Sequence, residues 1–552
     1  MHRLEQDYGQ DPHGVADWNK VADVELRIPS LIAHFEKYGD AELIVFDDDR
    51  LSYRQAAAQS ALLARQLLEA GVGKGTRVGM WLPSNANFIV VWLAIVRTGA
   101  VAVPISTLAT GTELRKIAKH ADLQWLLTVD QYLHHDYIGR LEEAFPDLKG
   151  ARAPFSLEEA PYLRHIWVWG GRQPPWATRV DPAREAGLDG DLLRQVETQV
   201  APSDLVSIIY TSGSTAEPKG VMHTHGAFMR QGAKVAATYP YLRGDRVFTQ
   251  MPFFWVGGLT LTVLNAMHLG ATLLSSGKTG AALLDFLEKE RVSFAVGWPH
   301  LMKALVSDPS FAKRDFSAMR GGGLAEAIPE KFRPKNQFFG QALGMTETCG
   351  PHTISLPDLP DSLRGSMGPP MPGMELKVVD IDSRVEMPEG QVGELLVRGD
   401  ALTVGMVKRE RADCFEADGW YRTADLCSFR SGHLFFHGRT DDMIKTAGAN
   451  VSPREVEAAL MSIPGVAQAN VYSVPDDKRG AVVGAIVAPA PGARLDAEGI
   501  RREAAKMLAS YKVPRVILIV EPSALPVMSS SKVDRRALLR MLHDHHKEQQ
   551  RQ

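Results

Sequence analysis

A short apolar segment that runs directly into a polar loop constrains the fold of this 552-residue chain more than any other feature. Residues 205–210 (LVSIIY) form a nearly continuous apolar run, which is typical of a strand buried on both faces. Upstream, the patterns alternate: 53–70 has helical spacing, 76–81 resembles a strand, 88–97 a helix and 100–104 a strand. This alternation predicts parallel sheets covered by helices, and therefore an α/β fold.

The chain is too long for a single core, and its pattern changes along its length. Short strand patterns at 376–379 and 393–397, separated by turn residues, predict a small β subdomain. A compact α+β pattern follows and ends in a polar stretch, 543–552, that is typical of a frayed tail. We expect a large domain over 1–440, with two packed βαβ subdomains and the small β subdomain, and a small α+β domain over 441–552.

The composition excludes several classes of protein. The formal net charge is −3, so the basic excess of a nucleic-acid-binding protein is absent. The three cysteines, Cys349, Cys414 and Cys427, lack metal-ligand spacing, and such sparse use fits a reducing cytoplasm. The most membrane-like run, 88–105, is interrupted by Arg97 and is shorter than the about 20 apolar residues that a spanning helix needs. We therefore expect no membrane span and a cytoplasmic location.

The loop after the apolar strand, 210–220 (YTSGSTAEPKG), concentrates groups that bind phosphate. Hydroxyls and backbone N–H groups can surround phosphate oxygens, and a lysine supplies the opposite charge. The loop lacks the Gly-x4-Gly-Lys-Ser/Thr pattern of nucleoside triphosphatases. A polar turn after a strand is the simpler alternative for this loop alone. Its candidate phosphate ligands are Thr211, Ser212, Ser214, Thr215 and Lys219.

With other segments in the same order, this loop resembles the signature of the adenylate-forming superfamily. That superfamily includes acyl-CoA synthetases, aryl-CoA ligases, luciferases and peptide-synthetase adenylation domains, and the resemblance is strongest to bacterial acyl-CoA synthetases. Several motifs in one order are a more specific signal than any single short pattern. The further matching segments are 321–324 (GGGL), 344–347 (GMTE), 421–425 (YRTAD), 438–445 (GRTDDMIK), 448–455 (GANVSPRE) and Lys532.

The resemblance implies ATP, Mg²⁺ and coenzyme A as cofactors, and it assigns nucleotide-binding residues. These residues are Thr211, Ser212, Ser214, Thr215 and Lys219 at the phosphates, Gly322, Gly323, Leu324 and Leu343 at the adenine, and Asp425 and Arg439 at the ribose. Taken singly, each charged member of this set would more often be an ordinary surface charge. The ordered set is what favours the nucleotide site.

The resemblance also implies catalytic roles. Activation of a carboxylate brings two anions together, so positioned donors and cations should supply most of the catalysis. Thr346 would donate to the α-phosphate, Glu347 would hold Mg²⁺ through oxygen, and Lys532 would bridge the carboxylate and the α-phosphate. The C-terminal domain would be mobile and rotate about Asp441. One orientation would insert Lys532, and the other would present the loop at Gly448 to the thiol arm.

The segment after the phosphate loop bears on the acid. Relatives that activate amino acids carry an aspartate in 251–259 (MPFFWVGGL), but no carboxylate occurs between Asp245 and Asp285. A buried ammonium without a partner would be costly, so an amino acid is not expected. Fatty, aromatic, alicyclic and terpenoid acids stay open, and plain core packing could also explain the aromatic residues. The candidate pocket residues are Phe254, Trp255, Gly257, Trp298 and Met345.

The expected function is therefore an acid:CoA ligase that makes an acyl-CoA through an acyl adenylate and releases AMP and pyrophosphate. Its small-molecule partners would be an apolar acid and CoA. A carrier protein is less favoured because no attached carrier domain is visible, and a homodimer stays open.

Four positions depart from the family pattern. Ala216 and Ser531 replace glycines, Leu343 stands where most relatives stack an aromatic ring on adenine, and Trp255 replaces a common histidine. Most of these changes touch the ATP-using step, which motivates a second hypothesis: a ligase that only transfers the acyl group of a preformed adenylate to CoA. A luciferase-like oxygenase and a non-catalytic nucleotide-binding protein are further alternatives.

Overall fold

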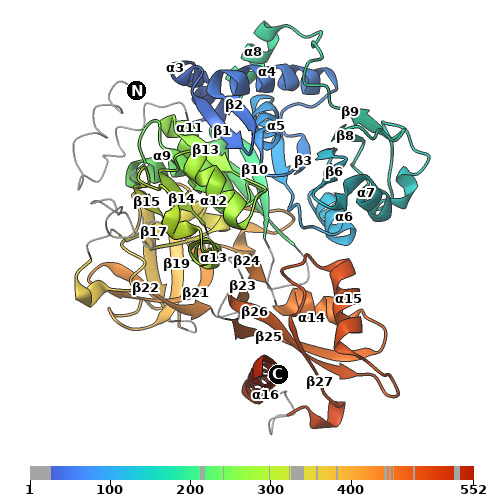
Figure 1. The fold of residues 1–552 in the computed structure, drawn as a ribbon, viewed down its shortest axis with the longest axis vertical. Helices are drawn as coiled ribbons and strands as arrows, with labels where there is room; N and C mark the ends of the chain where they lie inside the picture. Colours follow the sequence, from blue (N-terminus) through green and yellow to red (C-terminus); the bar gives the residue numbers. More distant parts are fainter. Residues whose placement is uncertain are drawn as a thin grey trace.

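The chain folds into a large N-terminal domain and a small C-terminal domain, both of which mix helices and strands (Figure 1). This arrangement confirms the α/β class. The structure, a computed structural model, describes residues 26–551 except for 212–217, 240, 298, 323, 325–340, 356–358, 381–382, 440–443, 447–448, 452, 477–478 and 527–534.

The apolar run at 205–210 forms β10, an inner strand of an eight-stranded sheet. In spatial order the sheet consists of β20 (Gly405–Met406), β11 (Lys219–Thr224), β10 (Leu205–Thr211), β4 (Val101–Pro104), β3 (Arg77–Trp81), β5 (Trp125–Val129), β8 (His165–Trp169) and β9 (Ala177–Arg179). From β10 to β9 all neighbours are parallel, as the strand–helix alternation predicts. β11 returns antiparallel to β10 across the phosphate loop.

A second sheet of six strands belongs to the same domain. Its order is β15 (Gly321–Gly322), β14 (Phe294–Val296), β12 (Arg246–Thr249), β13 (Thr272–Ser275), β1 (Glu42–Phe46) and β2 (Asp49–Ser52). The principal helices of this domain are α2 (Ile28–Ala33), α4 (Tyr53–Glu69), α5 (Ala86–Arg97), α6 (Gly111–His120), α7 (Tyr137–Ala144), α8 (Gly190–Thr198), α9 (His225–Thr238), α11 (Asn265–Leu269), α12 (Gly280–Lys289) and α13 (Pro299–Val306).

The helix α5 explains the membrane-like run in the sequence. Its residues 88–96 are all buried, and they share one hydrophobic cluster with Val78 of the first sheet and Leu273 of the second. The opposite face of the first sheet packs on α6 and α7, and that of the second on α12. The run is thus a core helix followed by a core strand, β4, as predicted. Within the described ranges, no helix is long and apolar enough to cross a membrane.

The predicted small β subdomain is a four-stranded antiparallel sheet. It consists of β18 (Met374–Val379), β19 (Gly393–Gly399), β21 (Tyr421–Arg430) and β22 (His433–Arg439), and a hairpin of β16 (Ala342–Met345) and β17 (Gly350–Ile354) lies beside it. The strands expected at 376–379 and 393–397 are therefore present.

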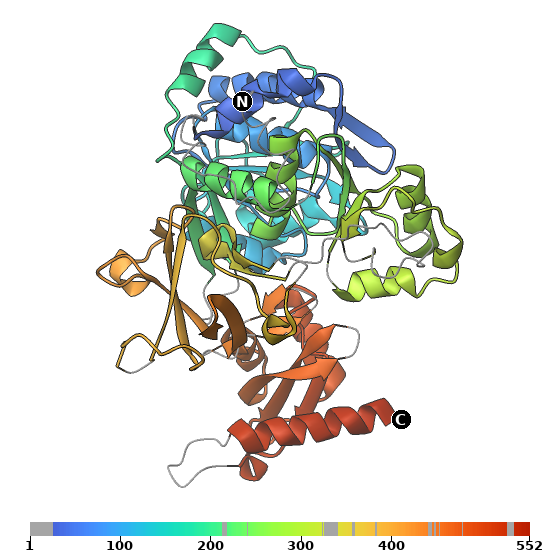
Figure 2. The same ribbon diagram turned by 90° about the vertical axis from the view of Figure 1, so that its left-hand side faces the viewer.

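The small C-terminal domain is built around a three-stranded sheet with helices on both faces (Figure 2). Its elements are β23 (Ile444–Thr446), β24 (Ala449–Val451), α14 (Pro453–Met461), β25 (Val466–Asp476), β26 (Gly480–Pro489), α15 (Ala497–Met507), β27 (Val516–Ile519) and α16 (Arg535–Arg551). Alternate residues of β26 point to opposite faces: Val483 packs with α14 and α15, and Val482 with α16.

The expected frayed tail at 543–552 is wrong, because α16 continues to Arg551. Leu538 and Leu542, one turn apart, are fully buried against the sheet. The His543 ring Nε2 lies 3.2 Å from the carbonyl oxygen of Ser473 on β25. These contacts anchor α16 as far as His543, and the helix continues through the polar residues to Arg551.

Four histidines with buried ring nitrogens should make the fold sensitive to acid. Burial lowers the pKa of His223, His225 and His352 to about 3 and that of His268 to about 4. The unfolded chain takes up these protons near pH 6.5. Stability is therefore fully present above pH 6.5 and is lost as the pH falls toward the folded pKa values. Each histidine contributes about 1.4 kcal/mol per pH unit within that window.

Urea midpoints between pH 7.5 and 4.5 should reveal this dependence as a steady fall. The variant His352→Gln should show a shallower fall than the unchanged chain, whatever its absolute stability. An identical slope in the two proteins would contradict the assignment to this histidine.

Candidate active site at the domain boundary

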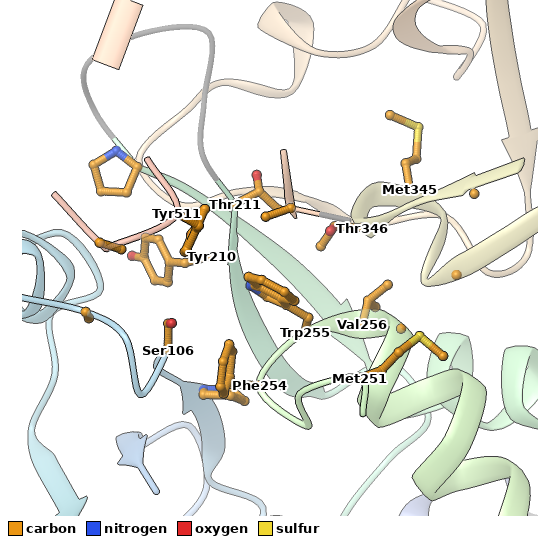
Figure 3. A pocket seen from close by; sticks show the side chains of 18 of the residues that line it. Ser106, Tyr210, Thr211, Met251, Phe254, Trp255, Val256, Met345, Thr346 and Tyr511 are labelled. Carbon is orange, nitrogen blue, oxygen red and sulfur yellow. The ribbon is translucent and has the colours of Figure 1, made fainter. Parts of the chain in front are cut away.

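A cavity of about 500 Å³ lies where the carboxyl end of β10 faces the C-terminal domain (Figure 3). Ligands of parallel α/β sheets bind beyond the carboxyl ends of the strands. The wall combines polar groups, Ser106, Thr211 and Thr346, with an apolar face from the segment after β12. Figure 3 shows Thr211 and Thr346 on the side of the cavity away from Ser106 and Phe254.

The strand pair β10–β11 positions the ends of the phosphate loop. Thr211 lies opposite Lys219 in the ladder, so the loop leaves and re-enters the sheet at adjacent residues. The preceding residue, Tyr210, is buried, and its hydroxyl lies 2.8 Å from Nδ1 of His120 on α6. Thr211 lines the cavity. The other loop residues singled out in the sequence, Ser212, Ser214, Thr215 and Ala216, lie outside the described residues.

Thr346 and Glu347 begin a single 3-10 turn, η7 (Thr346–Thr348), that directly follows β16. Thr346 lines the cavity, whereas Glu347 is buried behind it. The Tyr421 hydroxyl donates a hydrogen bond to Glu347 Oε1 (3.1 Å), and the Thr403 N–H donates to the Glu347 carbonyl (2.7 Å). The turn and the carboxylate are therefore held from the β subdomain.

A buried carboxylate with a fixed orientation fits Mg²⁺, which prefers oxygen ligands. Among the described side chains there is no group of three or more His, Cys, Asp and Glu residues that could hold a metal. Mg²⁺ in nucleotide sites is commonly held by one or two carboxylates together with the phosphates of the substrate. Glu347 suits that type of site.

The segment that the resemblance assigns to the adenine, 321–324, begins at the edge of the second sheet. Gly322 pairs with Ala295 and has φ +93°, and a Cβ there would lie 2.2 Å from the Ala295 carbonyl oxygen. Only glycine fits this close approach of two backbones. Leu324 is fully buried in the cluster beneath this sheet, and Gly323 lies outside the described residues.

The remaining nucleotide candidates lie on the β subdomain. Leu343 packs into the hydrophobic cluster of that subdomain, while its neighbours Ala342 and Gly344 line the cavity. Asp425 is buried on β21, directly opposite Arg439 on β22, and its N–H donates to Thr423 Oγ1 (3.0 Å). The contacts of Leu343, Asp425 and Arg439 with a nucleotide stay predictions. Asp441, Gly448, Ser531 and Lys532 fall outside the described residues.

The apolar part of the cavity contains most of the expected pocket residues. Phe254, Trp255, Gly257 and Met345 all line it, and Trp298 lies outside the described residues. The rings of Phe254 and Trp255 meet edge to face, 5.2 Å between centroids.

Sequence reasoning missed several wall residues. Leu261 belongs to a π-helical turn, Leu259–Leu264, which follows α10 (Val256–Gly258). Its position four residues after Gly257 is a signal that could have placed both on one face of a helix. Gly350 and Pro351 enter the wall from β17, for which the sequence carries no comparable signal.

The C-terminal domain supplies another part of the wall, which sequence reasoning also missed. The cavity wall includes Ala449, Glu455, Tyr511 and Lys512 of this domain, together with Glu113 of α6. In the described part of the cavity wall, the charged side chains are Glu113, Glu455 and Lys512, and both carboxylates pair with the Lys512 ammonium. The part of the wall around Met251 and Gly257 is therefore free of described charges.

Comparison with known proteins identifies the family to which this chain belongs. Residues 31–407 match the family described as AMP-binding enzyme, and residues 455–532 match the AMP-binding enzyme C-terminal domain. The chain is 29% identical over 500 residues to the long-chain-fatty-acid–CoA ligase FadD13 of Mycobacterium tuberculosis, covering 88% of this chain and 92% of that protein.

Two further similarities cover almost the whole chain. A long-chain-fatty-acid–CoA ligase of Escherichia coli is 28% identical over 542 residues, with coverage of 93% of this chain and 94% of that protein. The solved structure of a Mycobacterium tuberculosis fatty acyl CoA synthetase superposes with a TM-score of 0.61 at 25% identity, covering 95% of this chain and 99% of that one.

Proposed function

Because the chain belongs to the family of AMP-binding enzymes, we propose that it is an ATP-dependent acid:CoA ligase. It would convert an apolar carboxylic acid to its acyl adenylate, release pyrophosphate, and then pass the acyl group to the thiol of CoA. The observation that carries the proposal is one cavity with Thr211 and Thr346 on its wall beside an uncharged region. We call this region the acyl chamber; it is lined by Met251, Phe254, Trp255, Gly257 and Leu261. The names of the relatives, two of them long-chain-fatty-acid–CoA ligases, support the same chemistry.

In the first half-reaction, the chain's own residues would hold and orient the anions. Thr211 and Lys219, at the two ends of the phosphate loop, would bind the β- and γ-phosphates with Ser212, Ser214 and Thr215. Thr346 would donate to the α-phosphate, and Lys532 would bridge it to the carboxylate of the acid. Such preorganised donors and cations lower the barrier between two anions. Mg²⁺ held by Glu347 would neutralise phosphate charge when bound.

The rest of the nucleotide would lie against the β subdomain. Asp425 would accept hydrogen bonds from the ribose hydroxyls with Arg439 nearby, and the adenine would lie between the segment at Gly322, Gly323 and Leu324 and the strand that carries Leu343. The domain boundary would lie between 440 and 441, with Asp441 as the hinge and Gly448 in the loop that faces the thiol.

The acid that fits this cavity is uncharged beyond its carboxylate. The wall around Met251, Phe254 and Leu261 is apolar, and a charged or zwitterionic tail would lose its hydration there without a partner. Fatty, aromatic, alicyclic and terpenoid acids all meet this requirement.

The direct test is acid-dependent exchange of labelled pyrophosphate into ATP, followed by thioester formation with CoA. We expect exchange with at least one class in a panel of fatty, aryl and polycyclic acids, and no exchange with amino acids. Folded protein that shows neither exchange nor thioester formation with any member of the panel would contradict the proposal.

A hydrogen bond to the proposed Mg²⁺ ligand gives a sharper prediction. Tyr421→Phe removes the hydroxyl that donates to Glu347 and leaves the ring, which packs against Phe415 (5.4 Å between centroids). Loss of such a supporting contact weakens metal binding by about tenfold or more. Half-maximal pyrophosphate exchange should therefore require correspondingly more Mg²⁺, with the apparent KM for CoA unchanged. A Mg²⁺ titration that matches the unchanged enzyme would rule out this role.

Leu343 supports the second hypothesis, in which the protein only transfers the acyl group of a preformed adenylate to CoA. This residue packs in the β subdomain core and offers no aromatic ring for stacking on adenine. Thioester formation from a preformed acyl adenylate, without any pyrophosphate exchange, would favour this second function over the first.

A further inference from the structure

The C-terminal domain contributes an aromatic ring to the wall of the acyl chamber. Tyr511 lies in the turn between α15 and β27, 6.0 Å from Trp255 between ring centroids and at an interplanar angle of 86°. Trp255 belongs to the N-terminal domain and also contacts Phe254. Figure 3 shows both Tyr511 and Trp255 at the cavity. The chamber wall is therefore made partly by a residue that would leave if the small domain rotated.

The next residue, Lys512, ties the two domains together. Its Nζ lies 3.0 Å from Glu113 Oε1 on α6 and 2.7 Å from Glu455 Oε1 on α14. The side chains of Lys512, Glu113 and Glu455 are only 10%, 12% and 16% exposed. A single ammonium thus joins one carboxylate of each domain at the edge of the cavity.

The N-terminal side of this link is held by a helix cap. Glu113 is the third residue of α6 and forms a capping box with Thr110: the Thr110 N–H donates to Glu113 Oε2 (3.0 Å), and the Glu113 N–H donates to Thr110 Oγ1 (3.2 Å). The other carboxylate oxygen, Oε1, points to Lys512. Because the cap fixes the carboxylate, the ammonium has one well-defined position relative to the large domain.

Such a link specifies an orientation more than it stabilises the fold. A buried ion pair gains little net free energy over an apolar contact, but separation of its partners leaves charges unpaired. The orientation held here also places Ala449, the neighbour of Gly448, on the cavity wall. Under the proposed function, this is the segment that faces the thiol.

We propose that Tyr511 and Lys512 are positioning residues for acyl transfer to the thiol. Lys512 holds the small domain on Glu113, and this seats Tyr511 against Trp255 and completes the chamber around the acyl carbonyl. The thiol sulfur then attacks the carbonyl carbon as the C–S bond forms. The C–O bond to AMP breaks, AMP leaves with the electron pair, and the thiol proton passes to solvent. This inference rests on the proposed ligase function.

The test separates the two half-reactions in the full-length protein. Pyrophosphate exchange measures adenylation, and a single turnover of preformed acyl adenylate with CoA measures transfer. Tyr511→Ala and Lys512→Met should slow transfer by about tenfold or more, because misplacement of reacting groups by an ångström is costly. Exchange should stay within about twofold of the unchanged enzyme, since adenylation would use the other domain orientation. Tyr511→Phe, which keeps the ring, should transfer at the original rate.

Two further variants keep the test decisive. Glu113→Gln weakens the same ion pair from the large domain, and it should slow transfer as Lys512→Met does. It takes the place of Lys512→Met in the test if Lys512→Met folds poorly. Lys506→Met removes a matched, exposed lysine of α15 whose ion pair with Glu503 stays within the helix, and it should change neither half-reaction. Melting temperatures of all variants monitor folding.

The outcomes distinguish this inference from the proposed function. An equal fall in exchange and transfer, or no change in transfer, would overturn the positioning role while leaving the ligase intact. Failure of the unchanged protein in both half-reactions would instead overturn the ligase proposal.

Discussion

Replacing Lys532 by alanine is expected to lower acid-dependent pyrophosphate exchange by about 10²–10³-fold, the usual cost of losing one electrostatic stabiliser of a transition state. The physical reason is that a carboxylate must approach a phosphate while both are negative, and a single ammonium between them removes that repulsion. Transfer of a preformed acyl group to CoA does not require a carboxylate to approach a phosphate. It should therefore stay within a few-fold of the original rate.

The measurement compares exchange and single-turnover transfer in the same preparations. Lys547→Ala is the matched control, because this lysine is exposed on α16, in the same domain, and should leave both rates unchanged. Parallel loss of both half-reactions in Lys532→Ala would contradict the assigned role. If the unchanged protein lacked exchange altogether, the result would favour the transfer-only hypothesis.

Substitution by alanine should affect stability very differently at two adjacent glycines, Gly257 and Gly258, in the segment 251–259. A Cβ at Gly258 would lie 2.0 Å from the Pro252 carbonyl oxygen, whereas a Cβ at Gly257 would meet only the Met251 sulfur, at 3.3 Å. A backbone carbonyl cannot move aside as a flexible side chain can. Gly258→Ala should therefore cost about 3 kcal/mol or more in stability. It should also displace the cavity wall and remove most activity.

Gly257→Ala serves as the paired control and should fold normally. A larger residue there, as in Gly257→Leu, should fill the chamber and shift the preferred acids toward smaller ones. Urea unfolding and the acid panel measure the two effects separately. Equal midpoints for Gly257→Ala and Gly258→Ala would show that the segment relaxes around the added carbon.

The periodic parts of this fold could be predicted from the sequence. The apolar run at 205–210, the buried helix α5 and the strands β18 and β19 all appear where the patterns place them. Each of these elements is buried on one or two faces, and burial produces a regular spacing or a continuous run of apolar residues in the sequence. The candidate site segments were proposed from the resemblance, which depends on the order of several motifs along the chain, and their contacts with a nucleotide stay predictions.

The parts that could not be predicted depend on contacts between distant segments. Lys512 and Glu113 are 399 residues apart, and in sequence each resembles an ordinary surface charge. The helical end of α16 was missed for a related reason. The residues at this end are polar, and the sequence does not show that Leu538 and Leu542, which precede them, pack against the sheet. Leu343 shows a third case, because the sequence could not reveal that its side chain packs into the β subdomain.

The small domain contains its own hydrophobic interior. Among the residues that the structure describes, both clusters that flank its sheet draw their members from residues 444–542. Recombination between homologous ligases at the boundary would therefore leave each half's interior unbroken, so that only the shared surface must match. Such chimeras must therefore retain the ion pair between Glu113 and Lys512, which crosses this shared surface. Under the proposed function, exchange of the small domain would change how the thiol is presented and leave the acid-binding cavity wall of the large domain intact.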